Sequence, residues 1–185
     1  MAPKPKVTKE QIVSAALACV REGGVSSLTA KSLAQALSCS TQPIFWHFES
    51  MDALKREVFS AALEIFGQAL RREVDCKSRY LALGLNYIRF ATEERELFRM
   101  LFMSDFGKTD LVGANVEMEY VLGVIEETEH ITGEDAKTIY RDMWLFSHGI
   151  AAMMAAGTAH FSDEEVQCML SGVCRALIAS LENKK

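Results

Sequence analysis

The chain has 185 residues, of which 49% are hydrophobic and 24% are charged. This balance is typical of a globular protein and excludes collagen-like, disordered and low-complexity chains. Charged residues interrupt every apolar run before it reaches the roughly 18 to 20 residues of a membrane helix, so we expect no membrane span. The N-terminus is basic but lacks the apolar segment of a signal peptide, and we therefore expect a cytoplasmic protein.

Charge and cysteine content narrow the choice of partners. Residues 1–50 hold five basic and three acidic side chains, whereas the rest of the chain holds 15 basic and 22 acidic ones. The N-terminal end is therefore the part that suits a polyanion such as nucleic acid. The five cysteines form no C-x-x-C pair, and no spacing of His, Cys and carboxylate residues indicates a metal site. We expect reduced thiols and neither a metal nor a cofactor.

Apolar residues recur every three or four positions along almost the whole chain, and no segment alternates with period two. This pattern predicts an all-α fold. Helices are expected at about residues 8–22, 29–37, 40–48, 51–74, 77–92, 94–103, 109–131, 134–158 and 162–181. We expect a three-helix N-terminal domain over residues 1–50, joined by the long fourth helix to a C-terminal helical domain over residues 51–185.

Residues 29–48 have the pattern of a helix-turn-helix, two short helices joined by a short turn. Ser40 is expected to cap the second of these helices, with Pro43 in its first turn. Ile44 and Phe48 share a face that can pack on the first of these two helices. The face left toward solvent is then polar and aromatic, and it consists of Thr41, Gln42, Pro43, Trp46 and His47.

Such a face fits the major groove of DNA. Gln42 and Thr41 can bond base edges, and Pro43 can contact a thymine methyl. Trp46 or His47 can reach the sugar-phosphate backbone. Phosphate contacts are expected from Lys9, from Lys31, from the tail lysines Lys4 and Lys6, and from the helix start at Thr29. The alternative is a helix-turn-helix that serves packing alone.

The stretch from about residue 11 to residue 59 resembles the DNA-binding domain of TetR-family transcriptional regulators. The resemblance rests on Gly23-Gly24, Leu28-Thr29, Lys31-Ser32-Leu33-Ala34, Ser40, the run Ile44-Phe45-Trp46-His47-Phe48, and Leu54. The segments 96–102 and 144–149, the second with a Trp followed by His-Gly, are similar to one class of TetR C-terminal domains. The resemblance implies a homodimeric repressor whose C-terminal helices bind a small molecule.

Two positions depart from the family pattern. Phe45 stands where the family usually has a phosphate-binding Tyr, and Met51 stands where a Lys commonly begins the fourth helix. Phosphate anchoring is therefore expected to depend more on the remaining contacts. The full set of expected DNA-binding residues is Lys9, Thr29, Lys31, Ser40, Thr41, Gln42, Pro43, Phe45, Trp46 and His47.

The helix expected at 134–158 is apolar on nearly all sides after Gly149, so it needs cover on more than one side. A two-fold dimer in which this helix and the last one form a four-helix bundle would supply that cover. The expected interface residues are Ile150, Met153, Met154, Gly157, Val166, Leu170, Val173 and Leu177. The alternative is a monomer with a thick core.

The middle helices are rich in Met and Phe, which suit an adaptable apolar cavity between helices. The expected ligand-binding residues are Tyr87, Phe98, Phe102, Met103, Met118, Trp144 and His148. Tyr87 or His148 could supply an orienting hydrogen bond. Two alternatives stay open at this point: the Met and aromatic residues can be ordinary core, and His148 can be a buried structural histidine.

These features predict a DNA-binding transcriptional regulator, a homodimeric repressor that a small hydrophobic effector releases from palindromic double-stranded DNA, with an activator role left open. A helical-bundle enzyme or carrier for a hydrophobic small molecule is the competing class. No nucleophile with a base in reach is evident, and the acidic clusters at 126–129 and 163–165 are typical of solvated helix surface, so we expect no catalytic residues. The acidic total disfavours a DNA-packaging protein.

Overall fold

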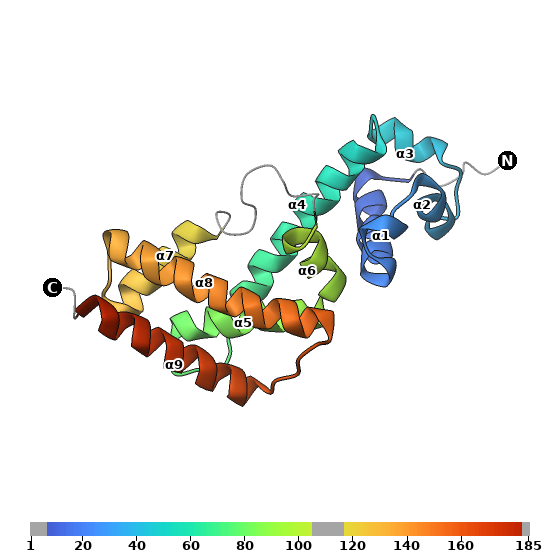
Figure 1. The fold of residues 1–185 in the computed structure, drawn as a ribbon. Coiled ribbons are helices and arrows are strands. Elements are labelled where there is room, and N and C mark those ends of the chain that lie inside the picture. The colour runs from blue at the N-terminus through green and yellow to red at the C-terminus, as the bar shows by residue number, and fades with distance from the viewer. Residues whose placement is uncertain (1–6, 105–116, 183–185) are drawn as a thin grey trace. The chain divides into compact units, whose positions relative to one another are not determined.

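The computed structural model describes residues 7–104 and 117–182, and the regular elements within these ranges are all helices (Figure 1). In chain order they are α1 (Lys9–Gly23), the 3₁₀ turn η1 (Val25–Ser27), α2 (Ala30–Ala36), α3 (Gln42–His47), α4 (Met51–Leu70), α5 (Arg79–Glu93), α6 (Arg95–Phe102), α7 (Met118–Glu129), α8 (Gly133–Ala156) and α9 (Asp163–Glu182). The all-α fold class is confirmed. No helix in the described ranges has the length and apolar run needed to cross a membrane.

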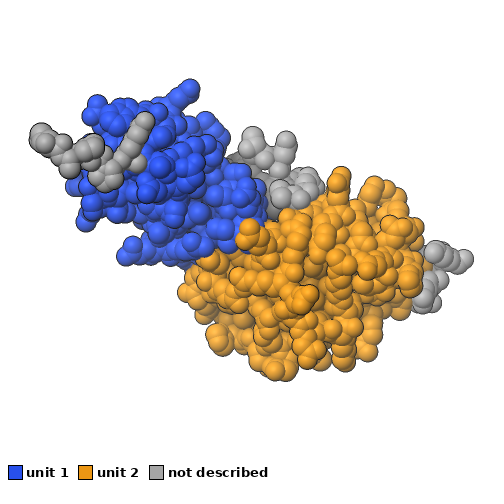
Figure 2. All heavy atoms as spheres, turned by 180° about the vertical axis from the view of Figure 1, so that it is seen from behind, with its two compact units in different colours: residues 1–65, 96–106 blue, residues 66–95, 107–185 orange. Residues whose placement is uncertain are grey.

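The chain divides into two compact units, coloured separately in Figure 2. Unit 1 comprises Met1–Ile65 with Glu96–Phe106, and unit 2 comprises Phe66–Arg95 with Gly107–Lys185. This division differs from the boundary expected at residue 50. The first part of α4 and most of α6 are grouped with the N-terminal helices, and their residues Leu54, Val58 and Leu97 are fully buried.

The core of unit 1 is built from one apolar stripe on each helix. Ile12 of α1, Leu33 of α2, Ile44 of α3 and Leu54 of α4 are all completely buried. Thr8 caps α1 in a capping box with Gln11, and Thr29 caps α2 in the same way with Ser32. Burial and a cap together stabilise α2, whose seven residues are too few for a helix that is stable alone.

The turn between α2 and α3 begins with Ser38 in the left-handed region, at φ +51°. Ser38 N–H donates to the carbonyl of Gln35, and Cys39 N–H donates to the carbonyl of Ala34, both at 3.0 Å. This is the Schellman pattern of a helix C-terminus, in which glycine is the usual left-handed residue. The turn geometry of the helix-turn-helix is therefore held by backbone hydrogen bonds and carries a serine where a side chain is unfavourable.

Unit 2 is built around α5, which packs against α7, α8 and α9. Ten of the 15 residues of α5 are buried. Gly84 lies where α5 approaches α9: a Cβ at this position would be 3.1 Å from Leu170 Cδ1. A glycine in the middle of this helix thus permits close packing, at the cost of a weaker intrinsic helix preference.

The long helix α4 ends at Leu70, four residues before the expected end at Val74. Residues 71–74 are ordinary helix formers, so local preference does not explain this end. The cause is Asn86 of α5, whose buried Nδ2 donates to the carbonyls of Leu70, at 3.0 Å, and Arg72, at 2.7 Å. The helix expected at 109–131 begins at Met118 within the described range, and residues 109–116 lie outside it.

Ser38→Gly is expected to stabilise unit 1. Glycine removes the steric cost of the left-handed backbone, roughly 1 to 2 kcal/mol. Part of this gain is offset because glycine loses more conformational entropy on folding than serine. The expected net gain in the free energy of unfolding is about 0.5 to 1 kcal/mol, measured by urea unfolding followed by circular dichroism.

The matched control is Ser14→Gly, at an exposed position inside α1, where the same substitution should destabilise by about 0.5 kcal/mol. A loss of stability in Ser38→Gly as large as in the control would contradict the left-handed assignment.

Candidate functional site

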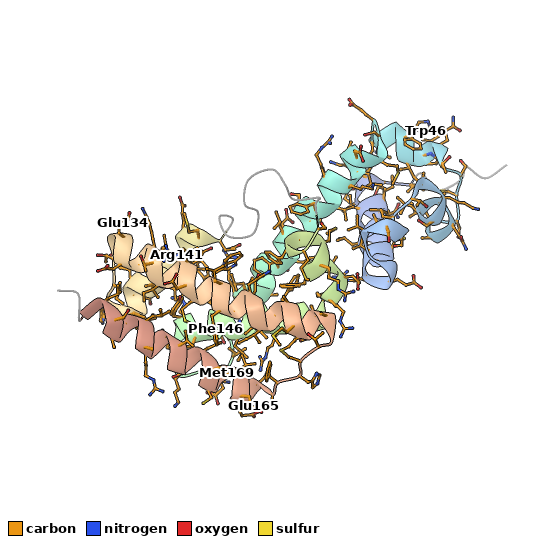
Figure 3. The ribbon with its side chains drawn as sticks, in the orientation of Figure 1. Trp46, Glu134, Arg141, Phe146, Glu165 and Met169 are labelled. Atoms are coloured by element: carbon orange, nitrogen blue, oxygen red, sulfur yellow. The ribbon has the colours of Figure 1, made fainter. Side chains whose placement is uncertain are left out.

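The first candidate site is the outward face of α3 in unit 1. Ile44 and Phe48 are buried as expected, whereas Phe45 is 46% and Trp46 66% exposed. Figure 3 labels Trp46, which projects from α3. Thr41, and not Ser40, is the N-cap of α3, and no side chain caps this helix. Ser40 and Thr41 are both exposed at the turn, and neither hydroxyl bonds the first backbone N–H groups of the helix.

A groove runs beside this face, between α1 and α3. Gln42, Pro43 and Trp46 form one wall, the turn residues 37–40 form its end, and the exposed face of α1 from Glu10 to Ala18 forms the other wall. The groove has a volume of about 1360 Å³ and is open to solvent. Gln42 and Pro43, predicted to contact bases, and Trp46, predicted to reach the sugar-phosphate backbone, therefore lie together on one concave surface.

Two of the predicted DNA contacts have partners inside unit 1. His47 Nε2 lies 3.0 Å from the carbonyl oxygen of Val7, which joins the end of α3 to the start of α1. Lys9 forms an ion pair with Glu57 at 2.6 Å and lies over the ring of Phe48 at 5.7 Å. These contacts position α1 against α3 and α4, so both residues have a structural role that the sequence pattern did not indicate.

The remaining predicted contacts differ in how free they are. Lys31 is exposed on α2 and has no ion pair among residues 7–104 and 117–182. The Thr29 hydroxyl is engaged by Ser32, with which it forms the capping box of α2. Lys4 and Lys6 lie outside the described residues. Among the described residues, Lys31 is thus a cation on this surface that is available to a phosphate.

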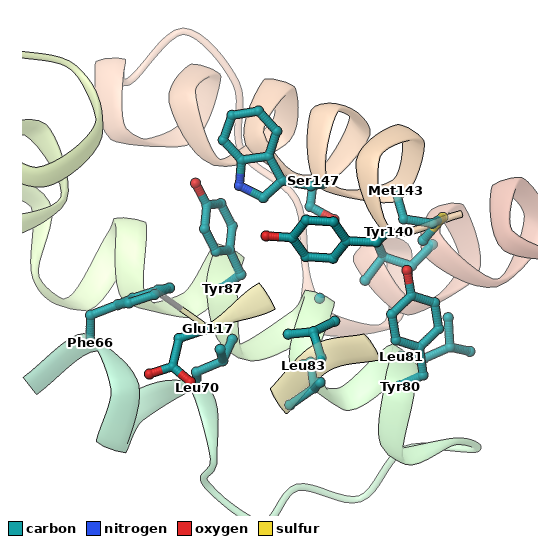
Figure 4. Close-up of a pocket in the computed structure, with 14 residues that line it drawn as sticks. Phe66, Leu70, Tyr80, Leu81, Leu83, Tyr87, Glu117, Tyr140, Met143 and Ser147 are labelled. Carbon is teal, nitrogen blue, oxygen red and sulfur yellow. The ribbon is translucent and has the colours of Figure 1, made fainter. Parts of the chain in front are cut away.

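The second candidate site is a cavity inside unit 2 (Figure 4). Its volume is about 60 Å³. Five aromatic side chains line it together with aliphatic, small and polar residues from α4, α5, α7, α8, α9 and the N-cap of α7. The lining residues are Phe66, Leu70, Tyr80, Leu81, Leu83, Gly84, Tyr87, Glu117, Val121, Tyr140, Met143, Trp144, Ser147 and Leu170.

Three residues predicted from the sequence meet at one side of this cavity. Tyr87 and Trp144 line it, and His148 contacts both of them without being part of the lining. The Tyr87 hydroxyl is 2.9 Å from His148 Nδ1, and the ring of His148 stacks on that of Trp144 with centroids 5.3 Å apart. Burial lowers the pKa of His148 and raises the pKa of Tyr87, so both groups are uncharged at neutral pH.

An ion pair lies at another side of the cavity. Arg71 Nη1 donates to Glu117 Oε1 at 3.1 Å and Arg71 Nη2 donates to Glu117 Oε2 at 2.5 Å. Gly67 gives this pair its room, because a Cβ there would lie 2.7 Å from Glu117 Oε1. The guanidinium also lies over the ring of Tyr120, 4.3 Å from its centroid. In the described parts of the chain, no three His, Cys, Asp or Glu side chains cluster as a metal site.

The other predicted ligand-binding residues lie elsewhere. Phe98 and Phe102 belong to α6, in the part of the chain grouped with unit 1, where their rings pack 5.1 Å apart. Met103 follows them and is 49% exposed. Met118 is adjacent to Glu117 but does not line the cavity. Sequence reasoning missed Phe66 and Leu70 of α4, Tyr80, Tyr140 and Glu117, since apolar periodicity does not tell a cavity wall from solid core.

Four of the residues expected at a dimer interface are core residues of unit 2. Ile150, Met154, Val166 and Leu170 are at most 9% exposed within the single chain, so they are not available to a partner. Met153 and Gly157 are exposed, and Val173 and Leu177 are half-buried. The apolar residues of α8 are covered in part by the same chain, where α8 packs against α5, α7 and α9.

A different face of α8 is apolar and open. Leu145 is 54% and Met153 48% exposed. Gly149 and Ala156 are exposed on the same helix, and no atom lies within 4 Å of the position where a Cβ at Gly149 would be. Figure 3 labels Phe146, which is half-buried beside this face. We call Leu145, Gly149, Met153 and Ala156 the outer stripe of α8.

Comparison with known proteins agrees with this geometry. Residues 12–58 match the family model of the bacterial regulatory proteins of the tetR family, and residues 80–177 match that of the tetracyclin repressor-like C-terminal domain. Among solved structures, TetR from Acinetobacter baumannii AYE is 19% identical with a TM-score of 0.63, covering 96% of this chain and 98% of that one. No curated protein matches the chain in sequence.

A second solved structure is a single-substitution variant of TetR from Acinetobacter baumannii AYE in complex with minocycline. It is 20% identical with a TM-score of 0.62, and the match covers 96% of this chain and 98% of that one. At this level of identity the similarity concerns the fold. Both family models fall on the candidate sites: one spans α3 and its groove, and the other spans most residues that line the cavity.

His148 is expected to make stability depend on pH. Its pKa in the folded chain lies below the ordinary value of 6.5, because burial disfavours the charged ring. The unfolded chain therefore binds more protons as the pH falls, so the contribution of His148 is present above pH 6.5 and is lost progressively below it. Urea unfolding between pH 7.5 and pH 5, run on wild type and His148→Asn, measures the difference.

Asn keeps a hydrogen-bonding atom near the position of Nδ1 but cannot take up a proton, so the variant should lose less stability over this range than wild type. His160→Asn, at an exposed position, is the control and should retain the wild-type pH dependence. Parallel pH profiles for wild type and His148→Asn would show that His148 is not held uncharged by burial.

Proposed function

Because the chain belongs to the TetR family and is a DNA-binding transcriptional regulator, we propose that it acts as a homodimeric repressor released from a palindromic operator by a small hydrophobic effector. The observation that carries the proposal is the coexistence of an exposed recognition face on α3 with an aromatic cavity in the other unit. A helical carrier or enzyme would account for the cavity but not for the helix-turn-helix. The activator alternative is tested by the effect of the protein on transcription in vitro.

For DNA recognition, we propose that α3 enters the major groove. Gln42 has the amide that pairs with the N6 and N7 edge of adenine, and Pro43 can contact a thymine methyl. Trp46, exposed beside them, is proposed to pack along the sugar-phosphate backbone. Phosphate attraction is proposed to come chiefly from Lys31, since Lys9 is paired with Glu57.

For assembly, we propose that the outer stripe of α8 is the dimer contact, with Val173 and Leu177 of α9 at its edge. Its glycine and alanine allow close approach of two helices, and its Leu and Met side chains supply apolar area that one chain leaves exposed. A two-fold axis would place each stripe against its copy and present two recognition helices to half-sites about 34 to 36 Å apart.

For effector response, we propose that a ligand in the cavity acts on the head through α4. This helix supplies Phe66 and Leu70 to the cavity wall and Leu54 and Val58 to the core of unit 1. A ligand that fits better in one position of α4 shifts the population toward that position. A difference of a few kcal/mol in ligand affinity between the two positions is enough to lower operator affinity.

Gln42→Ala is expected to weaken operator binding by about 1 to 3 kcal/mol, the usual cost of losing a specific base contact, whereas Trp46→Ala should weaken binding to operator and to scrambled duplex alike. Fluorescence anisotropy with operator and with scrambled duplex measures both affinities. Gln68→Ala, at an exposed position of α4 in unit 2, is the matched control and should bind like wild type.

Lys31→Ala is the contrasting variant: it should weaken all sequences alike and reduce the slope of log affinity against log salt by about one. If Gln42→Ala leaves the preference for operator over scrambled DNA unchanged, the assignment of α3 as the recognition helix is wrong.

Leu145→Glu and Met153→Lys are expected to convert the dimer into monomers, because an unpaired charge in an apolar contact is heavily penalised. Light scattering gives the mass, and circular dichroism shows that the exposed substitutions leave the fold intact. Glu126→Lys, on the exposed surface of α7, is the control for a charge change and should remain a dimer. Two variants that keep the wild-type dimer mass would place the interface elsewhere.

A further inference from the structure

The cavity of unit 2 contains a hydrogen-bond donor that the chain leaves unused. Trp144 Nε1 is buried, and no acceptor within residues 7–104 and 117–182 meets it with hydrogen-bond geometry. Trp144 is at the same time one of the residues that line the cavity. A buried donor without an acceptor is costly, and such groups are rare in folded proteins. The position therefore calls for an acceptor that comes from outside the chain.

The neighbouring hydroxyl is bonded to another ring. Tyr87 lines the same cavity and its oxygen is 2.9 Å from His148 Nδ1, but the indole Nε1 does not meet it with hydrogen-bond geometry. Burial raises the pKa of Tyr87, and the nearby indole lowers it by a smaller amount, so the phenol keeps its proton. The Tyr87–His148 bond and the stacking of His148 on Trp144 hold both rings in place. The indole N–H is thereby kept in a fixed position at the cavity wall.

The charge of the cavity excludes ionic ligands. Glu117 is the charged residue among those that line it, and its two carboxylate oxygens are both taken by Arg71. Arg71 Nη1 also donates to the carbonyl of Gly67 at 2.8 Å. A ligand cation or anion would have to break this pair or lie uncompensated among aromatic rings, and both are expensive. The pair leaves the cavity without net charge, so its ligand is uncharged.

The size and lining indicate how the ligand enters. The cavity measures about 60 Å³, well below the ~150 Å³ of an apolar cavity known to hold benzene. Met143 lines it and is buried, and a Met side chain has three rotatable bonds with which to give way. Five aromatic side chains surround the space, which suits a flat ring.

We propose that this cavity binds an uncharged, planar ring compound bearing a carbonyl oxygen or ring nitrogen that accepts a hydrogen bond from Trp144 Nε1. Met143 moves aside to admit the ring. This inference deepens the effector proposal and rests on it. A hydrocarbon of the same shape would leave the buried indole N–H unpaired, so the acceptor decides which flat compounds bind.

The test uses three probes of one shape on the full-length protein: 1-indanone, which has a carbonyl acceptor, indane, which has none, and 1-aminoindane, which is a cation at pH 7.5. Ligand-observed NMR titration measures each affinity. We expect 1-indanone to bind about tenfold more tightly than either of the others. Equal affinities of 1-indanone and indane would overturn the role of Trp144, and tighter binding of 1-aminoindane would overturn the requirement for an uncharged ligand.

Two variants locate the effect. Trp144→Phe keeps an aromatic ring but removes the donor, so 1-indanone should lose its advantage over indane. Met143→Ala enlarges the cavity and should increase the affinity of both, whereas Met169→Ala, at a half-buried position of α9 outside the cavity lining, should change neither. An advantage of 1-indanone that survives in Trp144→Phe would overturn the proposal even if wild type discriminates as expected.

Operator release separates this inference from the proposed function. Anisotropy of labelled operator is followed while 1-indanone is added to saturation. Binding that depends on Trp144 but leaves the operator bound contradicts the effector role and keeps the ligand chemistry. Failure of all three probes to bind wild type and Met143→Ala, in a protein that still binds operator, overturns the ligand chemistry and leaves DNA recognition intact.

Discussion

The burial of α5 on most of its sides is the constraint on which unit 2 depends. A helix covered by α7, α8, α9 and the end of α4 has little access to water, so each polar group on it must find a partner in the protein. Asn86 finds two backbone carbonyls and thereby ends α4 at Leu70. Tyr87 finds His148. The length of one helix and the orientation of two aromatic rings follow from the same requirement.

In unit 1 the constraint is different: two short helices must be held in place while large side chains on one of them remain exposed to solvent. Helices of seven and six residues are not stable alone. Leu33 and Ile44, both fully buried, supply the packing, and the turn between the helices is closed by the carbonyls of Ala34 and Gln35. Because these contacts point inward, the opposite face of α3 is free to carry Trp46 and Gln42 in a surface that burial does not require.

The helix-turn-helix could be predicted from the sequence because its evidence is local: caps, a turn and the spacing of Leu33, Ile44 and Phe48 lie within twenty residues. The end of α4 could not, since it depends on Asn86, which is 16 residues beyond Leu70. Ile150 and Met154 of α8 were assigned to a dimer interface, but they are buried within the single chain. Periodicity shows that Ile150 and Met154 are buried, but not whether their own chain or a second one covers them.

The cavity was predictable in its chemistry and only partly in its membership. Tyr87, Trp144 and His148 were identified by residue type, because aromatic and histidine side chains on an apolar helix are unusual enough to notice. Phe98 and Phe102 have the same signature but pack in the part of the chain grouped with unit 1. Glu117 carries no sequence signal, since its burial depends on a bidentate partner 46 residues away. Which aromatic residues share one space is decided by tertiary packing.

The small volume of the cavity bears directly on how an effector could act. A ligand that fits two conformations equally well shifts neither, however tightly it binds. A large preformed pocket would bind a ring without any displacement of α4. A cavity of about 60 Å³ must expand, and Phe66 and Leu70 of α4 form part of the wall that has to move. α4 is one helix of 20 residues, and under the proposed effector response a displacement at Phe66 is transmitted along it. Under the proposed effector response, the small cavity makes ligand binding selective for one position of α4. By linkage, operator binding then lowers the affinity for the ligand by the same factor.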